Sequence, residues 1–199
     1  MNKIVLYFVI NVLLASTYGC AFFRDSPPAI DARQRTSSED AQVLIDELLP
    51  DREWEIREMT ADALWNEMGV QLFTNVSAEQ YEYVFAITGD TARILKHHWG
   101  AYYFDYALAD MDGDGQKEML YIYDWGSGIV RSEMGVLKPD GSIAEIIPTE
   151  EATGIWSIRK PQTEHDGITC EVTSAMGESG AKKGLCIYEN DGYVFDIEE

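Results

Sequence analysis

The segment AYYFDYALADMDGDGQKEMLYIYDW (residues 101–125) decides how the fold of this chain is interpreted. In its first part, apolar and aromatic residues alternate with others from Tyr102 to Leu108, which is typical of a half-buried strand. Its last part, MLYIYDW, is rich in β-branched and aromatic residues and predicts a second strand. The sequence therefore predicts a hairpin at 101–124 with the acidic stretch DMDGDGQKE as its loop.

The loop places oxygen ligands at alternate positions. Asp110, Asp112, Asp114 and Glu118 carry carboxylates, and Gln116 stands where calcium loops use a backbone carbonyl. Like charges at this spacing repel one another unless a cation lies among them, and carboxylate-rich oxygen ligation selects a hard cation rather than zinc or copper. The sequence predicts a calcium site. The alternative is a solvated acidic turn without a metal, because Asp-Gly pairs are common in turns.

The pattern D-x-D-G-D-G-x-x-E at 110–118 resembles the calcium loop of FG-GAP and related VCBS-type repeats. The resemblance covers the loop and its two strands, and the Phe-Gly and Gly-Ala-Pro segments of the family are absent upstream. It implies calcium binding outside the cytoplasm, in adhesion or binding modules, and implies no reaction. An EF-hand would need Glu at the twelfth position, where this chain has Tyr121. A propeller would need several such repeats.

The first residues predict export. Lys3 precedes an uncharged, mostly apolar run from Ile4 to Leu14, which is too short for a membrane-spanning helix and suits the core of a signal peptide at 1–19. Cys20 after Gly19 resembles a bacterial lipobox, although Thr17 and Tyr18 depart from its usual residues. The resemblance implies that Cys20 is lipidated and becomes the new N-terminus. The proline-containing segment 20–36 then predicts a tether to the domain.

Ala21 after the cysteine fits sorting to the outer membrane. We therefore expect the protein in the cell envelope, anchored by lipid in the periplasm or at the outer membrane. The chain has 15 Lys and Arg against 35 Asp and Glu, a formal net charge of −20. Loss of 1–19 removes one Lys and no acid, which gives −21. Such a charge argues against nucleic acid or an anionic membrane surface as a partner and favours a cation.

The two remaining cysteines predict a disulfide. Cys170 and Cys186 form an even pair in a chain expected in an oxidising compartment. Both lie in segments that predict strands. The alternative is two buried free thiols.

The predicted fold class is α+β, a single domain at 37–199 in which N-terminal helices pack on a C-terminal antiparallel β meander or sheet. Apolar residues at helical spacing predict two helices. The first has apolar positions from Ala41 to Leu48, a cap at Ser37 or Ser38 and a stop at Pro50, and the second runs from Ala61 to Met68 between Thr60 and Gly69. A third helix is expected at 90–98. The segment YEYVFAIT stays ambiguous between helix and strand. After residue 101, strands and turns alternate.

Other candidate sites have a simpler structural interpretation. His97 and His98 suit the C-terminal end of the expected third helix. The turn after Asp124 and Trp125 is rich in glycine, and a binding surface that also includes Arg131 is the alternative. The five tryptophans are expected in core packing, with a carbohydrate site as the alternative.

The sequence thus predicts an exported, lipid-anchored, non-enzymatic calcium-binding envelope protein with a binding or structural role and a protein or carbohydrate ligand. The alternative is a periplasmic hydrolase that uses carboxylate acid–base chemistry. No Ser–His–Asp set is recognisable in the sequence.

Overall fold

The computed structural model describes residues 34–52, 54–76, 81–99, 103–126, 128–150, 152–165, 167–176 and 180–198. The expected signal peptide, Cys20 and most of the expected tether lie outside these residues. Arg33–Glu199 form one compact unit. Within the described residues, no helix is long and apolar enough to cross a membrane.

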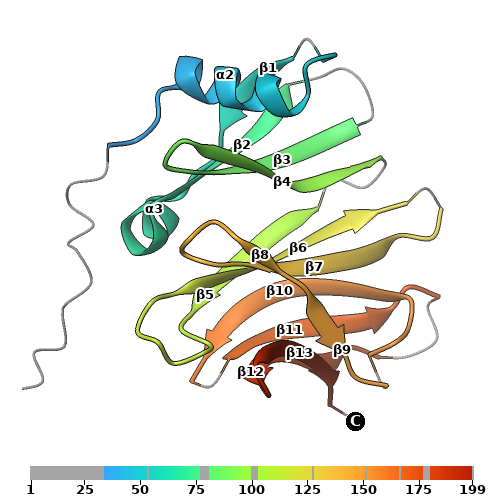
Figure 1. Cartoon of the computed structure of the whole chain (residues 1–199). Coiled ribbons are helices and arrows are strands. Elements are labelled where there is room, and N and C mark those ends of the chain that lie inside the picture. The colour runs from blue at the N-terminus through green and yellow to red at the C-terminus, as the bar shows by residue number, and fades with distance from the viewer. Residues whose placement is uncertain are drawn as a thin grey trace, which may run out of the picture. The chain divides into compact units, whose positions relative to one another are not determined.

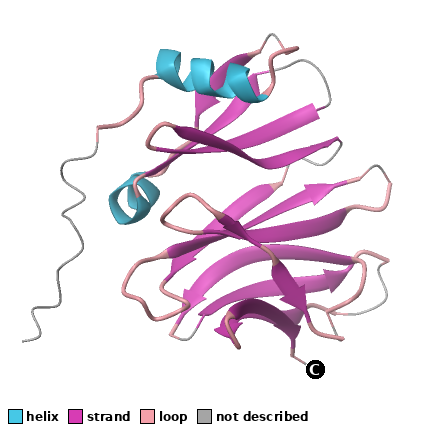
Figure 2. Ribbon diagram, viewed as in Figure 1, coloured by secondary structure: helices cyan, strands magenta, loops and turns pink. Residues whose placement is uncertain are grey.

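The described residues are mostly β, in three sheets with two short helices (Figures 1 and 2). The first sheet, in the order β1-β2-β3-β4, contains β1 (Glu55–Glu58), β2 (Val70–Val76), β3 (Tyr81–Thr88) and β4 (Thr91–Trp99). The second, in the order β5-β6-β7-β8, contains β5 (Phe104–Ala109), β6 (Glu118–Trp125), β7 (Arg131–Leu137) and β8 (Ile143–Ala144). The third, in the order β10-β11-β12-β13-β9, contains β9 (Ile146–Pro148), β10 (Trp156–Glu164), β11 (Gly167–Ser174), β12 (Lys182–Glu189) and β13 (Gly192–Ile197).

The two helices are confirmed, but the predicted α+β class is wrong. Helix α2 (Ser38–Leu48) is capped by the Ser37 side chain, which accepts a hydrogen bond from Asp40 N at 3.1 Å. Helix α3 (Asp62–Met68) ends at Gly69 in the left-handed region. The sheet β1–β4 occupies most of the N-terminal half, where helices were expected, so the helices do not form a layer on a single C-terminal sheet.

The expected helix at 90–98 is wrong because a β-bulge imitates its spacing. Val84 of β3 pairs with Lys96 of β4, whereas the next residue, Phe85, pairs with Ile94, which leaves Leu95 between them without a partner. The extra residue shifts the alternation of side chains by one position. Ala92 and Leu95, three residues apart, are therefore both buried as they would be on a helix.

The ambiguous segment YEYVFAIT is strand β3. It forms a hairpin with β4 in which Thr88 pairs with Thr91 across the turn of Gly89 and Asp90. Gly89 has a φ of +61°, which glycine adopts without steric cost. Asp90, where the expected helix would begin, therefore lies in a hairpin turn.

Strand β6 lies between two of the three core clusters. Met119, Tyr121 and Tyr123 pack with residues of the first sheet and α3. Leu120 and Ile122, on the opposite face, pack with residues of the third sheet. Every residue from Glu118 to Asp124 is buried, which explains why the strand is apolar or aromatic from Met119 to Tyr123. The third cluster joins α2 to the first sheet.

The predicted disulfide is absent from the structure, which has Cys170 and Cys186 as buried free thiols. The two residues lie on neighbouring strands, but Cys170 pairs with Gly184 and Cys186 pairs with Ile168. They are therefore diagonal neighbours, with Cα atoms typically about 7–8 Å apart, whereas disulfides join Cα atoms about 4.4–6.8 Å apart. Burial raises the pKa of each thiol to about 12, so both are weak nucleophiles.

Candidate metal centre

The acidic stretch forms the loop of the β5–β6 hairpin. Ala109 at the end of β5 pairs with Glu118 at the start of β6, so the hairpin brings Asp110 next to Glu118. Gly113 and Gly115 have φ values of +74° and +90°, which permit the tight turn between them. The local sequence thus closes the loop without help from a distant segment.

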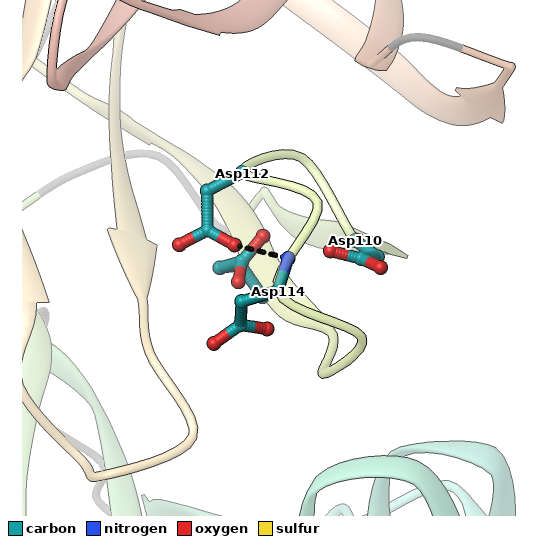
Figure 3. Close-up of side chains that lie close together, drawn as sticks. Asp110, Asp112 and Asp114 are labelled. Carbon is teal, nitrogen blue, oxygen red and sulfur yellow. Dashed lines mark hydrogen bonds between the residues drawn. The ribbon is translucent and has the colours of Figure 1, made fainter. Parts of the chain in front are cut away.

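The four carboxylates converge. One oxygen from each of Asp110, Asp112, Asp114 and Glu118 can be chosen so that all four lie within 4.8 Å of one another. Figure 3 shows three of these side chains around the loop, with the hydrogen bond from Asp114 N to Asp112 Oδ1 at 3.1 Å. These residues can hold a metal ion. The carbonyl of Gln116 stays a predicted ligand, since the described contacts of Gln116 are hydrogen bonds to Asp114.

Backbone N–H groups fix the orientation of the carboxylates. Asp110 Oδ2 accepts a hydrogen bond from Gly115 N at 3.0 Å, and Asp114 Oδ1 accepts one from Gln116 N at 2.7 Å. Glu118 Oε2 accepts one from Met111 N at 2.8 Å. At Asp114 the other oxygen accepts from the Gln116 side chain at 3.1 Å. A carboxylate offers about four lone-pair positions, so these orienting contacts leave positions for an ion.

No base forms an ion pair with the cluster within the described part of the chain, although Lys138 lines the adjoining hollow. None of the ion pairs found there involves the four carboxylates, and the ammonium group of Lys117 lies 3.6 Å from Glu67 instead. Three of the carboxylates reach solvent, but Glu118 is only 1% exposed. Burial, with smaller contributions from the charges of the three neighbouring aspartates, raises the pKa of Glu118 to about 7. Without an ion in the loop, the ionised form of Glu118 is therefore unfavourable.

A hollow of about 270 Å³ adjoins the cluster. It is lined by Asp112, Asp114, Gln116, Glu118 and the turn 138–140. Asp140, which lies in this turn, holds its carboxylate in hydrogen bonds to Ser142, and these bonds lower its pKa. The hollow gives an ion or its water molecules access to the cluster from solvent.

Tyr193 is a residue near the cluster that the sequence did not indicate. It is 2% exposed, and its hydroxyl has no hydrogen-bond partner among the residues that the structure describes. Burial raises the pKa of Tyr193, with smaller contributions from the charges of Glu118 and Asp112. Since Tyr193 belongs to β13, only the folded third sheet brings it to the loop, and no local signal could have predicted it.

The remaining sequence candidates lie elsewhere. His97 and His98 are in β4 and not at a helix end, so the predicted role for the helix dipole is wrong. The His98 ring stacks near Tyr123 and Trp125, and burial lowers its pKa. Asp124 is buried in an ion pair with Arg159, so it does not contribute to a surface with Trp125 and Arg131.

Comparisons with known proteins were made with the whole chain. No protein-family model matches it, and no curated protein and no solved structure matches it.

Proposed function

We propose that this protein is an exported, lipid-anchored, non-enzymatic calcium-binding protein of the cell envelope with a binding or structural role. The four converging carboxylates without a compensating base support calcium binding most directly. The pattern of the loop, which resembles FG-GAP and VCBS-type calcium loops, agrees with that chemistry. Export and the lipid anchor rest on the N-terminal sequence, at 1–19 and Cys20.

Calcium fits the loop better than the common competing ions. Calcium accepts six to eight oxygen ligands in flexible geometry, whereas magnesium requires a tighter octahedron and keeps several of its waters. Zinc and copper sites prefer nitrogen and sulfur ligands. Four carboxylates, one carbonyl and water from the adjoining hollow satisfy calcium without any nitrogen or sulfur.

The loop also suits a stabilising role. It joins β5 to β6, and β6 lies between two core clusters. An ion that neutralises the loop would therefore hold the start of the most buried strand in place. This arrangement favours a structural ion over a reactive one, because the metal would tie a hairpin together instead of facing an enclosed catalytic cleft.

Calcium titration followed by thermal unfolding tests the proposal. Extracellular modules commonly bind calcium with Kd values of about 10⁻⁴ to 10⁻³ M. At ten times Kd, binding to the native state adds about 1.4 kcal/mol to the free energy of unfolding. For a domain of this size the melting temperature should rise by roughly 3 to 6 °C. Chelator should reverse the rise, and magnesium should reproduce less of it.

Asp112→Ala should abolish the calcium response. Asp51→Ala is the matched control because Asp51 is exposed and lies after α2, outside the loop and its hollow. Asp140 is unsuitable as a control since it lines the hollow. A melting curve that does not move in millimolar calcium, with wild-type protein properly folded, would rule out the calcium site.

The proposed lipid anchor in the cell envelope can be tested independently of calcium binding. Full-length protein expressed in a Gram-negative host should fractionate with membranes, and Cys20→Ser should leave it unprocessed or release it into the periplasm. Wild-type protein that is wholly soluble, with an N-terminus beyond Cys20, would contradict the lipid anchor without contradicting calcium binding.

A further inference from the structure

A pocket of about 250 Å³ lies at the other end of β6 from the acidic loop. Trp125 ends β6 and pairs with Arg131, which begins β7, and both residues line the pocket. Trp156, the first residue of β10, lines it as well. Its volume equals that of about eight molecules of liquid water at roughly 30 Å³ each, so one ring-sized molecule fits.

Three N–H groups of the pocket-lining residues have no acceptor. The described residues contain four buried side-chain nitrogen or oxygen atoms without a hydrogen-bond partner, and three of them are Trp125 Nε1, Arg131 Nε and Trp156 Nε1. Indole and guanidinium groups donate hydrogen bonds and cannot accept them. The three donors are buried atoms of residues that line one pocket, and natural proteins satisfy nearly all buried polar atoms. Their concentration beside one pocket supports an acceptor from outside the chain.

The acceptors that line the same pocket are already engaged. Ser132 Oγ donates to Asp124 Oδ1 at 2.7 Å and accepts from Ile158 N at 2.8 Å. Glu133 Oε2 accepts from the Tyr123 hydroxyl at 2.5 Å and lies 3.6 Å from His98 Nε2. The groups without hydrogen-bond partners beside the pocket are therefore all donors, and they need acceptors.

Arg131 adds a positive charge without a partner. None of the ion pairs among the described residues includes Arg131, although acids outnumber bases by 35 to 15 in the chain. Its guanidinium carbon lies 4.5 Å from the centre of the Trp125 ring, a cation–π contact that fixes the direction of the side chain. A guanidinium presents a planar set of donors that matches a carboxylate.

The rest of the pocket is apolar. Its walls include Met134, Ile146, Ile155, Ile158 and Phe195. The Trp156 indole is held against Gly154, where an added Cβ would lie 2.5 Å from Nε1. A ligand that satisfies the whole pocket needs an acceptor group at the Trp125–Arg131 end and an apolar body against these walls.

We propose that this pocket binds a small organic carboxylate with an apolar body, with the carboxylate at Arg131 and the two indole N–H groups. A carboxylate is acceptor-only and offers about four lone-pair positions to the three donors. The three N–H groups are shielded from water in the free chain. Their side chains must therefore rotate slightly to bring these groups into contact with the carboxylate of the ligand. The pocket shares no lining residue with the acidic loop, and its function goes beyond calcium binding.

Calorimetric titration of the full chain with benzoate tests the proposal, with benzamide as the neutral ligand of matched shape. Benzoate should bind, and benzamide should bind at least about tenfold more weakly because hydrogen bonds to charged groups are the stronger ones. Trp125 and Trp156 line the pocket, so tryptophan fluorescence should change with the same affinity. Equal affinities for benzoate and benzamide, or no binding of benzoate at millimolar concentration, would overturn the proposal.

Arg131→Gln should weaken benzoate binding at least about tenfold, since it removes the charge and keeps a polar side chain of similar length. Arg57→Gln is the matched control, because Arg57 is exposed on β1 in another sheet. Trp156→Phe should weaken binding severalfold by removing one donor and keeping an aromatic ring. An unchanged calcium response would show that each variant is folded, and unchanged benzoate affinity in Arg131→Gln would contradict the proposal.

A free acid and the C-terminus of a peptide share this chemistry. A short peptide that ends in Phe with a free carboxylate should be compared with its C-terminal amide. Tighter binding of the free-ended peptide than of benzoate would identify a peptide terminus as the source, and preference for benzoate would identify a free acid. Binding of the amide as tight as that of the free peptide would overturn the role of the carboxylate.

Discussion

The two ends of strand β6 carry opposite hydrogen-bonding requirements. At its start, Glu118 joins three aspartates in a cluster of acceptors that forms no ion pair with a base among the described residues. At its end, Trp125 and Arg131 present donors that have no acceptor within the same described ranges. Eight residues of one strand thus separate a site suited to a cation from a site suited to an anion.

The difference shows where a buried strand can keep polar groups unsatisfied. In the middle of β6 the backbone N–H and C=O groups pair with β5 and β7, and the side chains enter two apolar clusters. Burial without partners would be costly there. Side chains without hydrogen-bond or charge partners lie instead at the ends of the hairpins, where strand pairing stops and a ligand can enter.

The largest expected effect in this comparison is a pH dependence of the free energy of unfolding, caused by Glu118 at the acidic end of β6. In the calcium-free chain the pKa of Glu118 is about 7, against an ordinary value of 4.5. Between these two values the folded chain holds a proton that the unfolded chain has released. The free energy of unfolding should therefore fall as pH rises from 4.5 to 7, by an amount on the order of 2 to 3 kcal/mol. Denaturant unfolding in chelator measures this slope.

Glu118→Gln should flatten that slope, because the amide has no proton to lose and its oxygen still accepts from Met111 N. Glu47→Gln, in the exposed part of α2, serves as the control. The lowered pKa of His98 acts with the opposite sign in both proteins, so the difference between wild type and variant isolates Glu118. Saturating calcium should also flatten the wild-type slope. A slope that is identical in wild type and Glu118→Gln would show that Glu118 titrates normally.

The smallest expected effect is communication between the two ends. Residues 118 and 125 are about 23 Å apart along an extended strand at about 3.3 Å per residue. This separation exceeds the Debye length of about 8 Å at physiological ionic strength. Saturating calcium should therefore change the benzoate Kd by less than about twofold, as measured by calorimetry with and without the ion. A tenfold change would mean that β6 transmits a conformational change between its ends.

The sequence predicted the acidic end because its signals are local. Alternation before residue 110 and the apolar run after 118 predicted the two strands that became β5 and β6. The ligand residues lie within nine positions, so the loop alone brings them together. The burial of Glu118 was not predictable, because it depends on packing by distant strands.

The sequence indicated the donor end only in part, as an alternative binding surface that includes Trp125 and Arg131. Trp125 and Arg131 are near each other in sequence, but Trp156 and the apolar walls arrive from the third sheet. The bulge at Leu95 shows a different limit, since one extra residue in a strand reproduces helical spacing. The predicted fold class was wrong because β4 was predicted as a helix and β3 was left ambiguous, so the first sheet was not recognised.

The position of β13 has a consequence for how the protein is made. This strand lies inside the third sheet, between β12 and β9, and β9 pairs with it in parallel although some forty residues separate them in the chain. During synthesis, β9 and the walls of the adjoining core have no partner until β13 leaves the ribosome. Non-local pairing of this kind slows folding and leaves apolar surface exposed. If the chain crosses a membrane before it folds, as we propose, it would meet this delay after export.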